Sequence, residues 1–287
     1  MKTLYEFSLI LLLAVILISC DEITSDYKQA NKPNTDTTTV DTTKVLKILL
    51  EDYTGFKCGY CPAAGELARD LAALYPGRVI LMSVHAGYFA TPTSTHTYDF
   101  RSPEGEGWND HFAIVGNPKG MVNRIKYEGS QVIEPSKWDA VIQSLLNSEA
   151  MMNIKLNTFF SLSRREITVD AVVTYIKDGK SSNQLVVNIL EDSIVQYQTD
   201  YRKTPPDIYD FVHNHVFRAS MNSTWGEALD TGDIKAGSVI KKSYIYKIPE
   251  GKNWRPEKLK IVAFVHDNGN TYEILQAEET EKIILII

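Results

Sequence analysis

The chain has 287 residues, of which 44% are hydrophobic and 23% charged, and its formal net charge is −6. This acidic balance, without a basic run, argues against nucleic acid as a partner. The length is enough for two modest domains. The sequence contains no P-loop, G-x-S-x-G or H-E-x-x-H motif, so we expect neither a cofactor nor a resident metal ion.

The amino terminus has the features of an export signal. Residues 1–19 begin weakly basic and continue as an apolar segment too short to span a bilayer. The segment ends in Ser19-Cys20, a small residue before a cysteine, which resembles the lipobox of bacterial lipoproteins. We expect cleavage before Cys20, lipid on its thiol and attachment to a membrane through this anchor. An ordinary signal peptide with a chance cysteine is the alternative.

Residues 20–44 are expected to form a flexible tether. The segment is rich in Thr, Asp, Asn and Lys and has almost no large apolar residues, so it cannot bury enough surface to fold. As a flexible chain it would reach about 25–30 Å from the anchor.

A C-x-x-C pair, Cys58 and Cys61, is the chemically most informative feature. An apolar run over 45–53 predicts a buried strand before it, and an amphipathic stretch over 62–75 predicts a helix after it. Two thiols at this spacing on the first helical turn can close a small disulfide and reopen it. The helix N-terminus, and Lys57 if its ammonium points at the sulfur, would favour a thiolate on Cys58. We expect Cys58 to attack and Cys61 to resolve.

The elements predicted for residues 45–149 follow the order of an α/β thioredoxin-like domain. After the cysteine helix comes an apolar strand at 78–84, and then a polar insertion at 87–111. A strand and its return at 121–133 lead to an amphipathic helix at 135–146.

The resemblance to the thioredoxin family implies further site residues. Asp52 lies six residues before the first cysteine, where that family carries a buried acid that moves protons. Pro118 precedes a strand, where that family has a cis-proline, and the preceding residue, here Asn117, pairs with extended substrate. We expect Asn117 and Tyr60 to contact the partner. Lys57 stands where the family usually has tryptophan, and Gly-Tyr replaces Gly-Pro, so the redox potential is not carried over.

Several alternatives remain open for these residues. The disulfide could be a permanent structural staple, Asp52 a solvated carboxylate at a strand end, and Pro118 an ordinary trans turn residue. A zinc site would need His213 and His215, but one pair of cysteines is only half a site and the histidines lie in the other predicted domain.

From residue 150 to 287 the hydrophobic pattern changes to period two. About seven strand candidates separated by turn sequences predict an all-β domain, an immunoglobulin-like sandwich. We find no catalytic set of residues in this half.

Three segments resemble an outer-membrane lipoprotein family of Bacteroidota, the twenty-eight-kilodalton outer-membrane protein family. They are Glu51-Asp-Tyr-Thr-Gly55 before the cysteines, Gly116-Asn-Pro-Lys-Gly-Met-Val-Asn-Arg124, and His213-Asn-His-Val-Phe-Arg218. The resemblance implies a lipoprotein of the outer membrane, facing the periplasm or the cell surface, with a thioredoxin-like domain and a β-sandwich. It supplies no substrate, because the family is named for its location.

Two functions are therefore compared. In the first, the protein is a thiol–disulfide oxidoreductase of the cell envelope that acts on the thiols or disulfides of exported proteins. In the second, it is a binding lipoprotein in which the disulfide is structural and the β-sandwich carries the binding. Fold alone does not decide between them.

Overall fold

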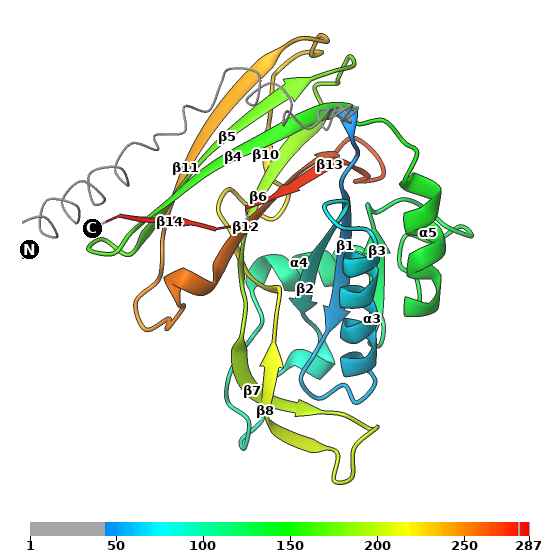
Figure 1. Cartoon of the computed structure of the whole chain (residues 1–287), viewed down its shortest axis with the longest axis vertical. Coiled ribbons are helices and arrows are strands. Elements are labelled where there is room, and N and C mark those ends of the chain that lie inside the picture. Colours follow the sequence, from blue (N-terminus) through cyan, green and yellow to red (C-terminus); the bar gives the residue numbers. More distant parts are fainter. Residues whose placement is uncertain (1–43, 281, 287) are drawn as a thin grey trace, which may run out of the picture. The chain divides into compact units, whose positions relative to one another are not determined.

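The computed structural model describes residues 44–280 and 282–286 (Figure 1). The first half contains β1 (Ile48–Thr54), α3 (Cys61–Leu74), β2 (Val79–His85), η2 (Tyr88–Ala90), α4 (Pro103–His111), β3 (Lys119–Val122), η3 (Pro135–Lys137) and α5 (Trp138–Leu145). β2 pairs with β1 in parallel, and β3 pairs with the other side of β1 in antiparallel. In place of a further strand, Gly120 and Ile133 exchange two backbone hydrogen bonds of 3.0 and 2.9 Å.

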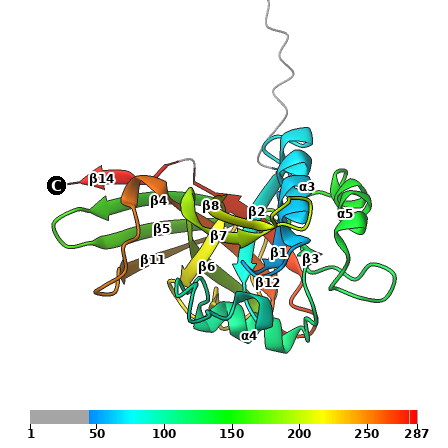
Figure 2. The ribbon, with the colours of Figure 1, turned by 90° about the horizontal axis from the view of Figure 1, so that it is seen from below.

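This order is the one expected for a thioredoxin-like domain. The helices α3 and α5 cover one face of the sheet and α4 covers the other (Figure 2). Alternation along β1 explains the two faces, because Ile48 and Leu50 pack toward α3 and α5 whereas Leu49 packs toward the side of α4. The predicted cysteine helix is present and has Pro62 in its first turn, where proline needs no hydrogen-bond acceptor.

The second half is built of strands, as the period-two pattern predicts. They are β4 (Met152–Ser161), β5 (Glu166–Tyr175), β6 (Asn183–Glu191), β7 (Ile194–Thr199), β8 (Asp207–His213), β9 (Val216–Ser220), β10 (Glu227–Ala228), β11 (Val239–Lys247), β12 (Leu259–Asp267), β13 (Ile274–Glu279) and β14 (Ile284–Ile286), with η4 (Pro256–Lys258) before β12. β5 shows the pattern most clearly, since its residues alternate between buried and partly buried along the whole strand.

The strands of both halves combine into one large mixed sheet. Its order is β13-β12-β6-β9-β2-β1-β3, with β10 beside β6. The two halves join where β9 runs parallel to β2, and the Ser83 N–H donates to the His215 carbonyl at 2.8 Å. β2 is buried on both faces, as a central strand of a sheet should be. The boundary predicted at residue 149 thus falls between α5 and β4. Strands before and after this boundary nevertheless pair in one sheet.

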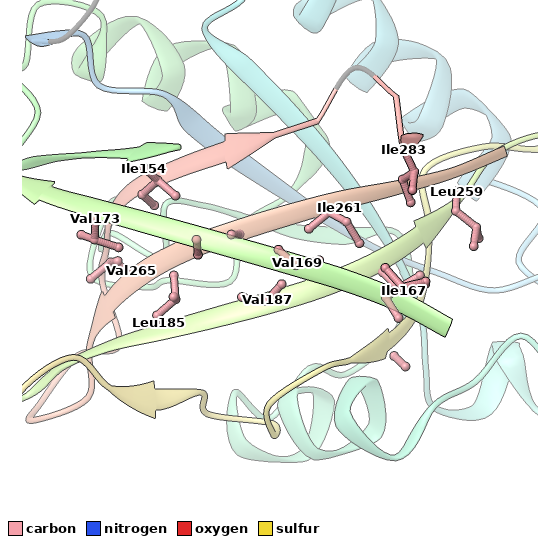
Figure 3. Close-up of a cluster of buried hydrophobic side chains, with 14 of the residues drawn as sticks. Ile154, Ile167, Val169, Val173, Leu185, Val187, Leu259, Ile261, Val265 and Ile283 are labelled. Atoms are coloured by element: carbon pink, nitrogen blue, oxygen red, sulfur yellow. The ribbon is translucent and has the colours of Figure 1, made fainter. Parts of the chain in front are cut away.

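A second sheet, β11-β5-β4-β14, packs against the β6 and β12 part of the first. Figure 3 shows the side chains between them, including Ile167 and Val169 of β5 opposite Val187 of β6 and Ile261 of β12. Each such side chain contributes about 1.5–3 kcal/mol by burial. Two packed β-layers are therefore present, but one layer continues the thioredoxin-like sheet, and the immunoglobulin-like arrangement is not confirmed. Periodicity indicates which face of a strand is buried and not which strand lies beside it.

A buried ion pair joins β1 to the segment after β3 and packs against the second half. Arg124 donates two hydrogen bonds to the Glu51 carboxylate, at 2.7 and 2.8 Å, and both side chains are completely buried. The guanidinium lies 5.4 Å from the ring of Trp108 and 5.0 Å from that of Phe264 on β12. Two of the segments that carry the family resemblance thus meet in the core.

Candidate functional site

The two cysteines form a disulfide at the start of α3. The Sγ atoms are 2.07 Å apart, and the Cα atoms 5.4 Å. The loop before the helix is a tight turn, in which the Cys58 N–H donates to the Gly55 carbonyl at 3.0 Å and the Cys61 N–H to the Cys58 carbonyl at 3.2 Å. The predicted pairing of Cys58 with Cys61 is therefore confirmed.

The disulfide is covered, which the sequence did not predict. Cys58 is 2% exposed and Cys61 3%. Exposure therefore does not distinguish the two thiols, and the expected attacking role of Cys58 stays a prediction. The β7–β8 hairpin of the second half covers this end of α3 (Figure 1).

The hairpin donates four hydrogen bonds to backbone carbonyls of the cysteine loop. Two come from backbone N–H groups, from Thr199 to Phe56 at 2.8 Å and from Tyr201 to Gly59 at 3.0 Å. The Gln198 side-chain amide makes the other two, to Cys58 at 3.0 Å and to Gly55 at 3.4 Å. Because two of these bonds come from backbone N–H groups, the backbone of the hairpin, and not only its side chains, holds the hairpin over the loop.

Side chains add further contacts between the hairpin, the cysteine loop and α3. The Tyr201 ring lies directly on Gly59, where an added Cβ would be 2.4 Å from a ring carbon. Tyr60, predicted to contact a partner, is 68% exposed and stands edge-on to Tyr201 with ring centroids 5.2 Å apart. Arg202 reaches Glu66 on α3 at 2.9 Å. The hairpin is therefore held both to the cysteine loop before the helix and to α3 itself.

Asp52 lies behind the disulfide. It is 4% exposed, and burial raises the pKa of its carboxyl to about 7, an effect that the charge of Arg69 partly opposes. At neutral pH the group therefore exists in both protonation states, as a proton donor and acceptor must. The expected burial is confirmed, and the role in proton transfer stays a prediction.

A cavity of about 40 Å³ connects Asp52 with the disulfide. Cys61 and Ser83 also line it, as do two histidines, His85 at the end of β2 and His213 at the end of β8. Both histidines are buried, and their ring centroids are 5.4 Å apart. The sequence analysis missed His85. The signal was a histidine at the end of an otherwise apolar strand, two residues after the position that pairs with Asp52.

The Asn117–Pro118 peptide bond is cis, as expected. Pro118 directly precedes β3, in which Lys119 pairs with Tyr53. Continuing this register places Pro118 beside Thr54, at the end of β1 from which the cysteine loop departs. Contact with the sulfur atoms and with a partner's backbone stays a prediction.

Other sequence candidates lie away from this centre. The Lys57 ammonium sits 4.4 Å from the centroid of the Tyr88 ring. His215 pairs with Asp192 at 3.6 Å, whereas His213 turns into the cavity, so the two do not act together. In the part of the chain that the structure describes, no three His, Cys, Asp or Glu side chains form a group that could hold a metal ion. The zinc hypothesis therefore has no ligand set there.

The predicted signal peptide, Cys20 and the tether up to residue 43 lie outside the described residues. Within residues 44–280 and 282–286, no helix is long and apolar enough to cross a membrane.

A disulfide on the first turn of a helix, with a buried acid behind it, gives the first half of the chain a thioredoxin-like arrangement, here in a sheet extended by a β-rich half. The chain belongs to the Omp28 family of outer membrane proteins, because the model of that family matches residues 106–282, more than half of its length. The outer membrane is accordingly its location. The match begins after the cysteine segment, so family membership by itself says nothing of the disulfide.

Two solved structures from Porphyromonas gingivalis are similar to the chain. HBP35 is 17% identical, with a TM-score of 0.63 over 84% of this chain and 78% of HBP35, and it shares the fold. A domain of the outer membrane lipoprotein Omp28 is 21% identical over 48% of this chain and 92% of that domain, with a TM-score of 0.32, too low to support a structural argument. A comparison with curated proteins gives no match.

Proposed function

We propose that the protein is a thiol–disulfide oxidoreductase, anchored to the outer membrane by lipid on Cys20, that acts on exported proteins. The observation that carries this proposal is the buried carboxyl of Asp52, which shares a cavity with Cys61 and has a pKa near neutrality. A buried carboxyl is costly to ionise, and a purely structural disulfide gives no reason to keep one behind it.

The reaction exchanges one disulfide for another. The Cys58 thiolate attacks a partner's disulfide, and one partner sulfur leaves as a thiolate. Cys61 then gives its proton to Asp52 and attacks Cys58 Sγ, so the Cys58–Cys61 bond forms while the bond to the partner breaks. Two electrons pass to the partner, whose two thiolates take up protons. An envelope protein carrying a dithiol would reduce the pair again, and the same steps in reverse oxidise a partner's thiols.

The cis-proline segment and the exposed ring of Tyr60 support the binding of a partner. Asn117 and Pro118 lie at the end of the sheet from which the cysteine loop leaves, and the backbone before Pro118 would pair with an extended partner segment. Tyr60 would add apolar contact.

Trapping of partners tests the proposal. In cells, Cys61→Ser should accumulate mixed disulfides between Cys58 and envelope proteins, because the resolving thiol is missing. Cys58→Ser is the matched control and should accumulate far fewer. A redox titration with mass-spectrometric readout should place the pair near the poise of the envelope. A potential far below that poise, together with no adducts on either variant, would show that the disulfide is a staple.

The covered disulfide favours the second candidate, a binding lipoprotein with a structural disulfide. A sulfur that is 2–3% exposed is poorly accessible to an attacking thiolate. The two candidates differ in the rate at which a protein dithiol reduces the native protein. Reduction within minutes supports the oxidoreductase, whereas resistance over hours without denaturant supports the binding protein.

A further inference from the structure

We propose that His85 and His213 act as positioning residues that hold water against Asp52 in the cavity behind the disulfide and so serve proton transfer with Cys61. The inference rests on the proposed redox function and extends it. Neither histidine stands near the cysteines in the sequence. They reach the cavity from β2 and from the hairpin of the second half.

The strand register places His85 on the same face of the sheet as Asp52. In the parallel pair of β1 and β2, Asp52 lies opposite Ser83 and Thr54 opposite His85. Side chains two residues apart on a strand point to the same face. Both Asp52 and His85 therefore face α3, and the cavity is the space between them and Cys61.

Polar atoms in this cavity have no partner in the protein. Asp52 Oδ1 and both ring nitrogens of His85 are buried without a hydrogen bond. Phe100 packs edge-on to the His85 ring with centroids 4.3 Å apart and offers no hydrogen-bonding group of its side chain. A buried polar group without a partner costs about 1–3 kcal/mol. A cavity of about 40 Å³ lined by several polar groups is large enough to hold ordered water.

Burial keeps both imidazoles neutral. Burial lowers the pKa of His85 well below its ordinary value, and His213 and Arg218 lower it further. Burial lowers the pKa of His213 to about 4, although contacts with the Tyr197 and Gln196 carbonyls oppose this. A neutral imidazole has one N–H donor and one acceptor nitrogen. His85, whose two ring nitrogens have no partner, can therefore both give a hydrogen bond to water and receive one, whereas His213 donates from Nε2 to the Tyr197 carbonyl and offers water only its other nitrogen as an acceptor.

Together these groups would carry a proton from Cys61 to water. The Asp52 carboxylate takes the proton from Cys61, and the water held by the histidines stabilises the ionised carboxylate and then exchanges the proton with it. Arg69, which also favours the ionised form of Asp52, lies on α3 and lines the same cavity. Because His213 belongs to β8, the hairpin that covers the disulfide also completes this site.

The test follows the titration of Asp52 by carbon-13 NMR of its carboxyl group in the reduced protein. His85→Phe and His213→Phe should each raise the Asp52 midpoint by at least half a pH unit, because the carboxylate loses its hydrogen-bonded water. His266→Phe is the matched control, since His266 is equally buried on β12 and does not line the cavity. His85→Gln, which keeps a polar group, should restore most of the native midpoint and serves if the Phe variant does not fold.

A kinetic measurement separates this inference from the proposed function. The rate at which Cys61 closes the disulfide should fall about three- to tenfold at pH 6.5 in His85→Phe and His213→Phe. The pH midpoint of this rate should rise by the same amount as the Asp52 midpoint. Unchanged Asp52 titration in both variants would overturn the role of the histidines. If the titration moves but the native protein exchanges no disulfide with any protein dithiol, the water site stands and the oxidoreductase assignment fails.

Discussion

At the scale of single residues, Asp52 links stability to pH. Burial raises its pKa from 3.8 to about 7, so the folded state holds a proton that the unfolded state releases between these values. The contribution of Asp52 to the free energy of unfolding is therefore greatest below about pH 4, falls as the pH rises, and is smallest above the folded pKa of about 7. Asp52→Asn should be more stable than the native protein at pH 8, by up to about 4 kcal/mol, and about equal at pH 4. Urea denaturation at both pH values checks this, and a difference that does not depend on pH would contradict it.

The pair formed by Glu51 and Arg124 makes a second prediction at this scale. Arg124→Met leaves the Glu51 carboxylate buried without its partner and should cost about 3–5 kcal/mol of unfolding free energy. The surface pair of Arg164 and Glu166 is the matched control, and Arg164→Met should cost less than about 1 kcal/mol. Combining Glu51→Leu with Arg124→Met should restore most of the loss. Equal effects of the two arginine substitutions would refute a special role for the buried pair.

At the scale of elements, the β7–β8 hairpin controls access to the disulfide. Gly59→Ala would place a methyl group 2.4 Å from the Tyr201 ring, and Arg202→Ala would remove the bond to Glu66, so both should loosen the hairpin. We expect a small dithiol to reduce the disulfide about two- to fivefold faster in Arg202→Ala, since a partly exposed ion pair contributes about 0.2–1 kcal/mol. The effect of Gly59→Ala should be larger. Arg165→Ala, remote from the hairpin, should leave the rate unchanged, and equal rates in all variants would show that the hairpin is no barrier.

At the scale of the whole molecule, the shared sheet predicts that residues 44–280 unfold as one unit. A buried cluster crosses the junction of the halves, with Met82 and Val84 of β2 packed with Val186 of β6 and Phe264 of β12. Denaturation followed by tryptophan fluorescence and by circular dichroism should give coincident transitions. A fragment of residues 44–149 exposes half of this cluster and should show no cooperative transition. A fragment with a transition of its own would establish the separate domain that the sequence pattern predicted.

Much of the site could be predicted before the structure, because its chemistry is local. About 30 residues encode the spacing of Cys58 and Cys61, the strand before them and the helix after them. The structure contains the disulfide, the strand and the helix. The burial of Asp52 and the cis bond at Pro118 followed from a family resemblance, and both are present. The cover over the disulfide could not be predicted, because Gln198 and Cys58 are 140 residues apart and no periodicity records such a contact.

The sequence by itself determined most of the strands, the helices α3 and α5, the faces they bury and where the two thiols meet. It did not show the helix α4 within the polar insertion or the strand β7. Short-range sterics and the 3.6- and 2-residue periods settle these properties within each segment. Only the tertiary structure decided that β9 extends the thioredoxin-like sheet, that a hairpin covers the disulfide, and that His85 and His213 meet at Asp52. Strand pairing depends on hydrogen bonds between identical backbones, so many pairings suit one hydrophobic pattern, and the packing of the complete chain selects among them.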